Sequence, residues 1–228
     1  MQTVDFIEGI VNLMTPELEI ENVLDNGDGT QTITVCNLYW IRKFLTVTID
    51  GNNYEVSAFD SNNKTFTIPS SPLVAVDSFT LTAPYYFHGS PMQVNNEWIV
   101  QKQDSDKYPL VYLVETLTDS FYDELDQKDK DMSLRIFFLE SFSSRYPEVD
   151  AHYSETIVPL RASLDYFVEL LKSDSTTLPF SYDVINRIQV GTYTTNQGET
   201  NEVFSDRLDG VEFVGTVTVL KSNDNCNC

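Results

Sequence analysis

Two apolar runs in the second half of this 228-residue chain decide the fold, Tyr108–Thr116 (YPLVYLVET) and Met132–Phe142 (MSLRIFFLESF). Both are mainly apolar and contain several aromatic side chains, which is typical of buried strands. The residues Glu148–Lys172 are predicted to form one long helix, and Tyr182–Tyr193 and Val211–Lys221 are predicted to be further strands. This order of elements predicts an α+β core with one long helix packed on a sheet.

The predicted long helix carries an apolar stripe whose members recur at steps of three and four residues. One face of the helix must therefore pack on the predicted sheet. Pro159 lies inside the helix and lacks a backbone N–H, so it should kink the helix or divide it in two. The stripe consists of Tyr153, Ile157, Leu160, Leu164, Phe167 and Leu171.

The first 14 residues are predicted to form a short amphipathic helix. Val4, Ile7 and Ile10 recur at helical spacing, with Thr3 as the expected N-cap. Pro16 ends the helix. This helix is either a separate element or part of the core.

From residue 15 to residue 91 the apolar period changes to two, which is typical of strands. Asn26–Gly29 and Asp50-Gly51 tolerate positive φ, so each predicts the turn of a hairpin. Six short strands at this spacing predict a small all-β sandwich or barrel. They are Glu17–Leu24, Thr30–Cys36, Leu45–Ile49, Tyr54–Ala58, Thr65–Ile68 and Ser78–Ala83.

The chain is expected to divide into a β-rich part and an α+β part. Pro84–Pro91 is predicted to be the junction between them, and Met92–Gln103 is predicted to be helical. The β-rich part either precedes the core elements or is inserted between them. The expected units are an N-terminal helix (1–14), a β-rich domain (15–91), an α+β core (92–222) and a tail (223–228).

The formal net charge is −21, from 35 acidic and 14 basic side chains. Such a surface repels phosphate groups, so adhesive binding to DNA or RNA and docking to anionic lipid are both disfavoured. Met1–Met14 carries Asp5 and Glu8 without a basic start, so we expect no signal peptide, and the apolar runs are too short to span a bilayer. With three cysteines, a disulfide framework is not expected.

The candidates for metal or catalytic chemistry are weak. His88 and His152 fall in different predicted elements, and Cys226 and Cys228 lie in a polar tail without further ligands to complete a site. The stretch Asp25–Thr30 resembles a calcium loop, but its spacing fits a hairpin turn better. We expect no catalytic residues, no metal and no cofactor.

An acidic segment separates the two core strands and is predicted to be a loop. A general acid needs a carboxyl group in an apolar pocket, whereas these carboxylates are surrounded by other charges. The loop is either a solvated surface or a surface that faces a lumen or a neighbouring subunit. Its acidic residues are Asp119, Asp123, Glu124, Asp126, Asp129 and Asp131.

The aromatic residues of the β-rich part mostly fall on alternating positions, where a small core needs them. The run Tyr85-Tyr86-Phe87 breaks this alternation. It is therefore a candidate interface or a candidate glycan-binding cluster.

A resemblance to a known group of proteins rests on short phrases and on their order. The first phrases are Lys107–Leu113 and Met132–Leu139, and Ser205–Glu212 is the last. Between them lies the helix that begins near His152-Tyr153 and contains Val158-Pro159-Leu160. This layout resembles small virion proteins of phages and prophages from Bacteroidetes, and is similar to that of phage neck and tail-terminator proteins. The resemblance covers roughly residues 92–221, so the β-rich part looks like an insertion or a decoration.

The resemblance implies a structural role. Neck and tail-terminator proteins form a homo-oligomeric ring, expected here as a hexamer or a dodecamer, that caps the tail tube and joins it to the head connector. DNA would pass through the ring without specific binding, and the protein would be assembled in the host cytoplasm and located in the virion. The expected partners are other copies of the chain, the tail tube and neck or connector proteins, with no membrane.

Two other classes of function stay open. A baseplate or receptor-binding module would use the β-rich domain to bind a glycan or a protein. An acid-dependent hydrolase would need two facing carboxylates in a cleft, one of them with a raised pKa.

Overall fold

The computed structural model describes residues 2–69, 74–90, 108–114, 118–124, 127–141, 153–190, 192–194, 200–202 and 208–220. For 118–124, 127–128, 188–189, 192–194 and 200–202 the backbone alone is described. The described residues form a mixed α+β structure, mostly strands with one long helix, as the sequence predicts. The predicted helix at 92–103 lies outside the described residues.

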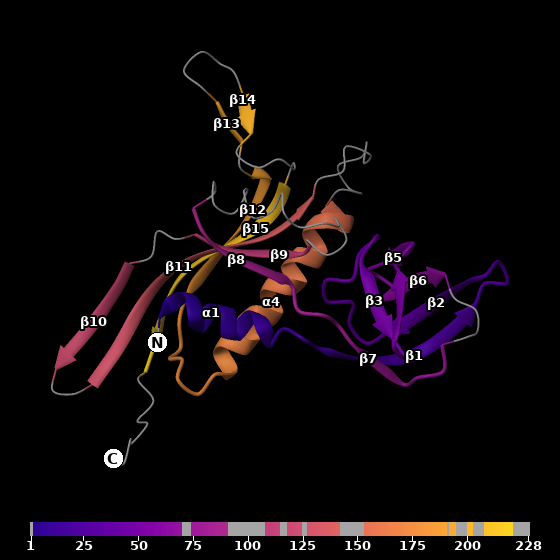
Figure 1. Ribbon diagram of the computed structural model, residues 1–228, viewed down its shortest axis with the longest axis horizontal. Coiled ribbons are helices and arrows are strands. Elements are labelled where there is room, and N and C mark those ends of the chain that lie inside the picture. Colours follow the sequence, from indigo (N-terminus) through magenta and orange to yellow (C-terminus); the bar gives the residue numbers. More distant parts are fainter. Residues whose placement is uncertain are drawn as a thin grey trace.

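The central element is a mixed sheet with the order β12-β15-β11-β9-β8, and β10 pairs with the first half of β11 (Figure 1). Only the β8–β9 pair is parallel among these described strands. The strands are β8 (Tyr85–Gly89), β9 (Leu110–Val114), β10 (Thr118–Glu124), β11 (Gln127–Ser141), β12 (Tyr182–Val190) and β15 (Leu208–Val219). A small hairpin of β13 (Thr192–Thr194) and β14 (Thr200–Glu202) stands apart from the sheet.

The long helix covers one face of this sheet. A single π-helical turn, η2 (Tyr153–Ile157), leads into α4 (Val158–Ser173). Pro159 thus lies in the first turn of α4, where a missing N–H costs little, and the winding changes from π-helical to α-helical one residue before it. The ring of Phe167 lies 5.6 Å from that of Phe138 on β11 and 6.1 Å from that of Phe213 on β15.

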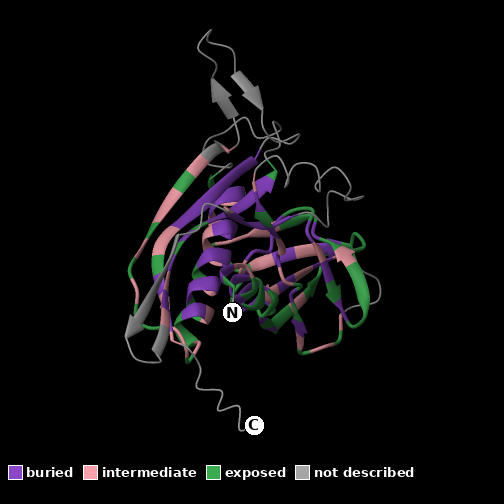
Figure 2. Ribbon diagram, turned by 60° about the vertical axis from the view of Figure 1, so that its left-hand side comes forward, coloured by how far each residue is buried: buried purple, intermediate pink, exposed green. Residues whose placement is uncertain are grey.

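The predicted stripe is buried with one exception. Its members from Ile157 to Leu171 are at most 3% exposed, whereas Tyr153 is 46% exposed. The π-helical turn explains the exception, because its wider winding rotates Tyr153 out of line with the α-helical stripe that follows. In Figure 2 the buried side of α4 faces the sheet.

The β-rich part contains two groups of strands. A five-stranded antiparallel sheet has the order β5-β6-β2-β1-β7, and a separate hairpin of β3 and β4 packs against β7 and β6. Both predicted hairpins are confirmed. The strands are β1 (Glu17–Asp25), β2 (Thr30–Val35), β3 (Thr46–Ile49), β4 (Asn52–Glu55), β5 (Ala58–Asp60), β6 (Thr65–Pro69) and β7 (Ser78–Thr80).

The β-rich part is inserted between two core elements. The N-terminal helix α1 (Thr3–Asn12) contacts α4 and β8, so it belongs to the core. The chain then makes β1 to β7, which lie to one side of α4 in Figure 1, and returns to the central sheet at β8. The prediction that Pro84–Pro91 is a junction is therefore wrong, because Tyr85–Gly89 completes the edge of the central sheet. We call residues 17–81 the insertion.

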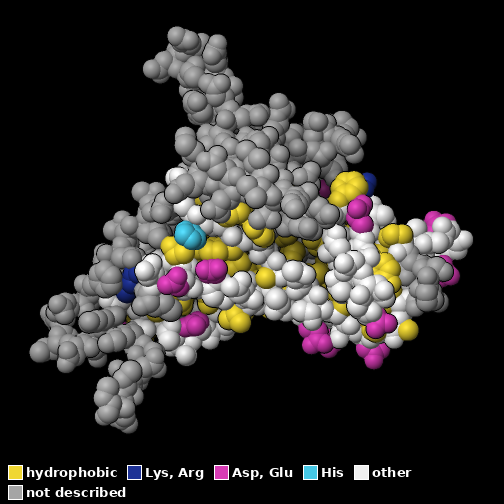
Figure 3. Space-filling model, in the orientation of Figure 1, with side chains coloured by type: hydrophobic (Ala, Val, Ile, Leu, Met, Phe, Trp, Pro, Cys, Tyr) yellow, Lys and Arg dark blue, Asp and Glu magenta, His cyan; other side chains and the backbone are white. Residues whose placement is uncertain are grey.

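One continuous apolar core joins α1, the insertion, the central sheet and α4. The opposite face of the central sheet holds a second buried cluster, because neighbouring residues of a strand point to opposite sides. Phe137 and Leu139 belong to this second cluster, whereas Ile136 and Phe138 belong to the first. On the face of the molecule seen in Figure 3, acidic side chains are scattered rather than gathered into one patch.

Candidate functional site

The acidic segment is a β-hairpin, so the prediction of a loop is wrong. Asp119, Asp123 and Glu124 lie on β10, while Asp129 and Asp131 lie on β11. The backbone register pairs Ser120 with Asp131 and Asp123 with Lys128. Asp126 lies outside the described residues. We call Thr118–Glu124 together with Gln127–Ser133 the arm.

The base of the arm is fixed to the body by two hydrogen bonds. Lys130 Nζ donates to Thr3 Oγ1 on α1 at 2.6 Å, and Thr218 Oγ1 on β15 donates to Asp131 Oδ1 at 2.6 Å. Thr3 thus binds the arm. The N-cap of α1 is Gln2, so the prediction that Thr3 is the N-cap is wrong. Beyond Lys130 the described backbone of the arm pairs only with itself, and Figure 1 shows it projecting from the sheet.

β12 forms one edge of the central sheet. Residues Tyr182–Arg187 pair in regular register with β15, and the register then shifts between Arg187 and Val190. Within the described part of the chain, no strand pairs with the other side of β12, and none pairs with the outer side of β10. Unpaired edges of this kind present backbone N–H and C=O groups that can bind another strand.

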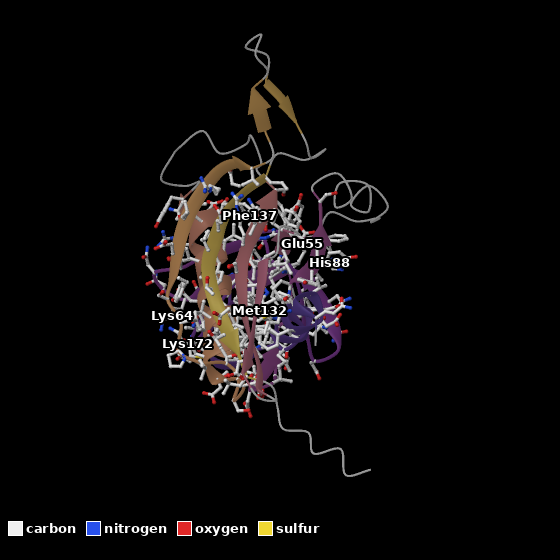
Figure 4. The ribbon with its side chains drawn as sticks, turned by 90° about the vertical axis from the view of Figure 1, so that its left-hand side faces the viewer. Glu55, Lys64, His88, Met132, Phe137 and Lys172 are labelled. Atoms are coloured by element: carbon white, nitrogen blue, oxygen red, sulfur yellow. The ribbon has the colours of Figure 1, made fainter. Side chains whose placement is uncertain are left out.

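Three basic residues lie along the β12 edge and a fourth lies nearby on β11, although the whole chain is strongly acidic. Arg161 on α4 donates to Asn186 Oδ1 on β12 through Nε at 3.1 Å and Nη2 at 3.0 Å. Lys172 Nζ lies 5.4 Å from the ring centre of Tyr182, and Figure 4 shows this lysine on the β12 side of the sheet. Arg135 and Arg187 complete the group on the other face of the sheet.

Arg135 and Arg187 flank one buried carboxylate. Glu212 lies on β15, between β11 and β12, and its side chain is 1% exposed. Arg187 Nε lies 2.5 Å from Glu212 Oε2, and Arg135 Nε binds Glu212 Oε1 from the other side. The two guanidinium groups are 52% and 43% exposed, so this cluster is a buried anion bridged by two partly hydrated cations. Sequence periodicity gave no signal for it, because its members come from three strands.

Two hollows lie beside the beginning of β12. One is about 430 Å³ and is lined by polar and apolar residues, mostly of β11, β12 and β15, including Ser133, Asp183 and Val214. The other is about 290 Å³ and is lined by Lys172 and the segment Thr177–Phe180. Leu178 in that segment is 39% exposed, which leaves an apolar surface next to the β12 edge.

A second buried ionic cluster joins the insertion to the central sheet. The loop between β2 and β3 carries Arg42, which forms an ion pair with Glu140 on β11, and both side chains are almost fully buried. Burial raises the pKa of Glu140 to about 7, and the nearby Arg42 opposes this rise without cancelling it. Asp209 on β15 is directly opposite Glu140 in the strand register and is 0% exposed.

This cluster contains two neighbouring carboxyl groups and a raised pKa, which are features that a hydrolase site would need. However, Glu140 is engaged by Arg42 inside the core, and the two hollows described above lie elsewhere. The arrangement therefore acts as an internal connection between the insertion and the sheet.

The run Tyr85-Tyr86-Phe87 does not form one exposed patch. Tyr86 Oη donates to the backbone oxygen of Val4 on α1 at 3.3 Å, and burial raises the pKa of Tyr86. Tyr85 and Phe87 turn to the opposite face, where their rings lie 4.9 Å apart within the second apolar cluster. The three side chains therefore alternate between the two faces of β8, an edge strand that is packed on both faces.

The remaining candidates have local roles. Asp28 Oδ1 accepts hydrogen bonds from the backbone N–H of Thr30 at 3.0 Å and from its hydroxyl at 2.6 Å, and these bonds stabilise the hairpin turn between β1 and β2. These bonds lower the pKa of Asp28. His88 is exposed on β8. His152, Cys226 and Cys228 lie outside the described residues, and among the residues that are described no three His, Cys, Asp or Glu side chains gather as a metal site would require.

No helix within the described ranges is both long enough and apolar enough to cross a bilayer. Comparison of the sequence with models of known protein families gives no match, and comparison with curated proteins gives none either.

Proposed function

We propose that this protein is a structural component of a tailed-phage virion, which forms a homo-oligomeric ring at the neck or at the tail end. The ring would join the tail tube to the head connector and let DNA pass. The protein would be assembled in the host cytoplasm. Its partners would be other copies of itself, the tail tube and neck or connector proteins.

One observation carries this proposal: within the described residues the central sheet has open edges on different sides, β8 and β12 at its two ends and β10 on the arm. A protein with two dissimilar binding edges can associate head to tail, and head-to-tail contacts close into rings when the rotation between copies permits it. The sequence resemblance to phage neck and tail-terminator proteins, which covers roughly residues 92–221, also supports the proposal.

The charge of the chain is a second support. A ring through which DNA slides needs a lumen that does not adhere to phosphate groups, and a net charge of −21 satisfies this need. The arm contributes five described acidic residues on a paired backbone that is fixed at its base. The pairing of β10 with β11 gives the backbone of the arm a defined register.

The test is the mass of the full-length protein in solution by multi-angle light scattering, with and without tail tubes isolated from the phage that encodes it. We expect either a closed ring visible by negative-stain electron microscopy or a 26.0 kDa monomer that assembles only on the tube end. A protein that stays monomeric and does not bind tail tubes at any concentration would overturn the proposal.

A second function, a baseplate or receptor-binding module, is favoured by one feature of the insertion. Phe44 is 44% exposed, although its backbone has φ 69°, in the left-handed region that bulky residues rarely adopt. The ammonium group of Lys43 lies 5.1 Å from the centre of its ring. Strained residues of this kind are held in place by their surroundings and often serve binding.

The binding alternative predicts that full-length protein binds a glycan array or host surface and that Phe44→Ala removes this binding. Leu24→Ala is the matched control, because Leu24 is 57% exposed elsewhere on the insertion. Equal binding by both variants and the unaltered protein would rule out Phe44 as the contact residue.

A further inference from the structure

We infer that the arm of one copy pairs with the β12 edge of the next copy, so that β10 becomes the neighbour of β12 in a sheet continued between subunits. This inference rests on the proposed ring and names the surfaces that would form it. The occupant of the β12 edge is thus a second copy of this chain.

Hydrogen bonding provides the first argument. β10 spans seven residues, and the regular part of β12 before its register shift spans the six residues Tyr182–Arg187. Neither outer side is paired within the described residues. Pairing the two edges would satisfy the backbone groups of both, and the register shift at Arg187/Val190 would mark the end of the paired region.

Charge complementarity provides the second argument. Residues 118–131 contain six acidic side chains and two lysines, a net charge of −4. Arg187 lies on β12 itself, and Arg161 and Lys172 on α4 contact Asn186 and Tyr182 of β12. In a chain of net charge −21, these three cations along the β12 edge would attract an acidic strand.

The hollow next to Lys172 provides the third argument. It is lined by Leu178, Pro179 and Phe180 and opens beside Tyr182, at the beginning of the β12 edge. The described backbone of β10 includes the apolar positions Phe121 and Tyr122. A strand that runs along β12 would bring apolar residues to this recess.

Because the arm and the β12 edge are different surfaces, the contact is heterologous. Each copy offers one arm and one edge, so every copy in a closed ring uses both. A dimer in which two identical surfaces meet would leave both arms or both edges unused.

Charge reversal tests the pairing under the conditions in which the unaltered protein assembles. The arm variant is D119K/D123K/E124K, and the edge variant is R161E/K172E. We expect each variant alone to need more than about tenfold higher concentration to assemble, because like charges then meet at the contact. A chain that carries all five substitutions restores opposite charges and should assemble again.

The matched control is K43E/K64E, which changes the charge by the same amount as the edge variant at two exposed lysines of the insertion. It should assemble like the unaltered protein. Circular dichroism and thermal unfolding of each variant establish that the fold is kept.

Assembly of the arm or edge variant at the concentration of the unaltered protein would overturn the inference and leave the ring proposal standing. If the variant with all five substitutions fails to regain assembly, the inference is also overturned, because the arm and the β12 edge would then not contact each other. Failure of the unaltered protein to assemble at all, with or without tail tubes, would instead overturn the proposed function.

Discussion

Arg42 in the insertion and Glu140 in the central sheet form an ion pair inside the protein, with 11% and 5% of their side chains exposed. The pair is accompanied by aromatic contacts from the same loop, since the rings of Tyr39 and Trp40 lie 5.1 Å and 6.0 Å from that of Tyr166 on α4. The insertion is therefore joined to the core by buried charge as well as by apolar packing. Such a connection has measurable consequences for stability.

The stability of the protein should depend on pH through Glu140. Its pKa is raised from 4.5 to about 7 in the folded state, so the folded protein holds this proton at a pH where the unfolded chain has released it. The resulting contribution to the free energy of unfolding is fully present below pH 4.5 and is lost as the pH rises through about 7. Its size is about 3 kcal/mol.

Urea unfolding of the protein and of Glu140→Gln at pH 5, 6, 7 and 8 checks this dependence. The amide does not titrate, so the difference in stability between the two proteins should change by about 3 kcal/mol across this range. A constant difference would show that Glu140 does not titrate in this window.

Removal of one partner of the Arg42–Glu140 pair should cost more than removal of both. Arg42→Met leaves a buried carboxylate without its cation and should lower the free energy of unfolding at pH 8 by about 3–5 kcal/mol. The double variant R42M/E140M should recover part of this loss, because no buried charge remains at the pair. A double-mutant cycle by chemical denaturation measures the coupling, and additive effects would contradict it.

Gly210→Ala should destabilise the central sheet. A Cβ at this position would lie 2.6 Å from Leu139 Cδ2 and 2.7 Å from the backbone oxygen of Phe138. The side chain can move, but the backbone oxygen belongs to the β11–β15 ladder, so we expect a loss of about 1–3 kcal/mol. Gly9→Ala is the control, since nothing lies within 4 Å of a Cβ there and alanine favours a helix. Thermal unfolding should move in opposite directions for the two variants.

Substitutions of the two arginines that bind Glu212 should have non-additive effects on the free energy of unfolding. Either Arg135→Met or Arg187→Met leaves the buried carboxylate with one cation, so each single change should cost about 1 kcal/mol or less. The double variant leaves the carboxylate without either and should cost about 3–5 kcal/mol. Equilibrium denaturation of the three variants measures these losses. If the loss in the double variant equals the sum of the losses in the two single variants, the two arginines do not act jointly on Glu212.

The local structure followed closely from sequence patterns. The period-two stretches at 17–25 and 30–35 are strands. They form a hairpin because the residues between them accept positive φ, as Gly27 and Gly29 do at 75° and 85°. The helical stripe from Ile157 to Leu171 was equally plain, because an apolar residue at every third or fourth position leaves one face that must be buried. Short-range rules suffice for these segments.

Two segments misled the interpretation of the sequence. Tyr85–Gly89 has proline and glycine around it and was predicted to be a junction, yet it is a strand because β9 provides a parallel partner more than twenty residues later. The acidic segment was predicted to be a loop because Asp and Glu disfavour strands, yet the pairing of β10 with β11 in a hairpin overrides that preference. In both segments a ladder of hydrogen bonds outweighs the local propensity.

The sequence by itself determined which segments of this protein are strands and helices over most of the described chain, and that the surface is acidic. Periodicity, turn residues and charge are local properties, so they can be read without knowing the fold. Only the tertiary structure decided that the β-rich segment is an insertion, that Glu140 meets Arg42, and that β10 and β12 present open edges. These relationships join residues far apart in the chain, and their energies depend on burial and pairing that exist only after folding.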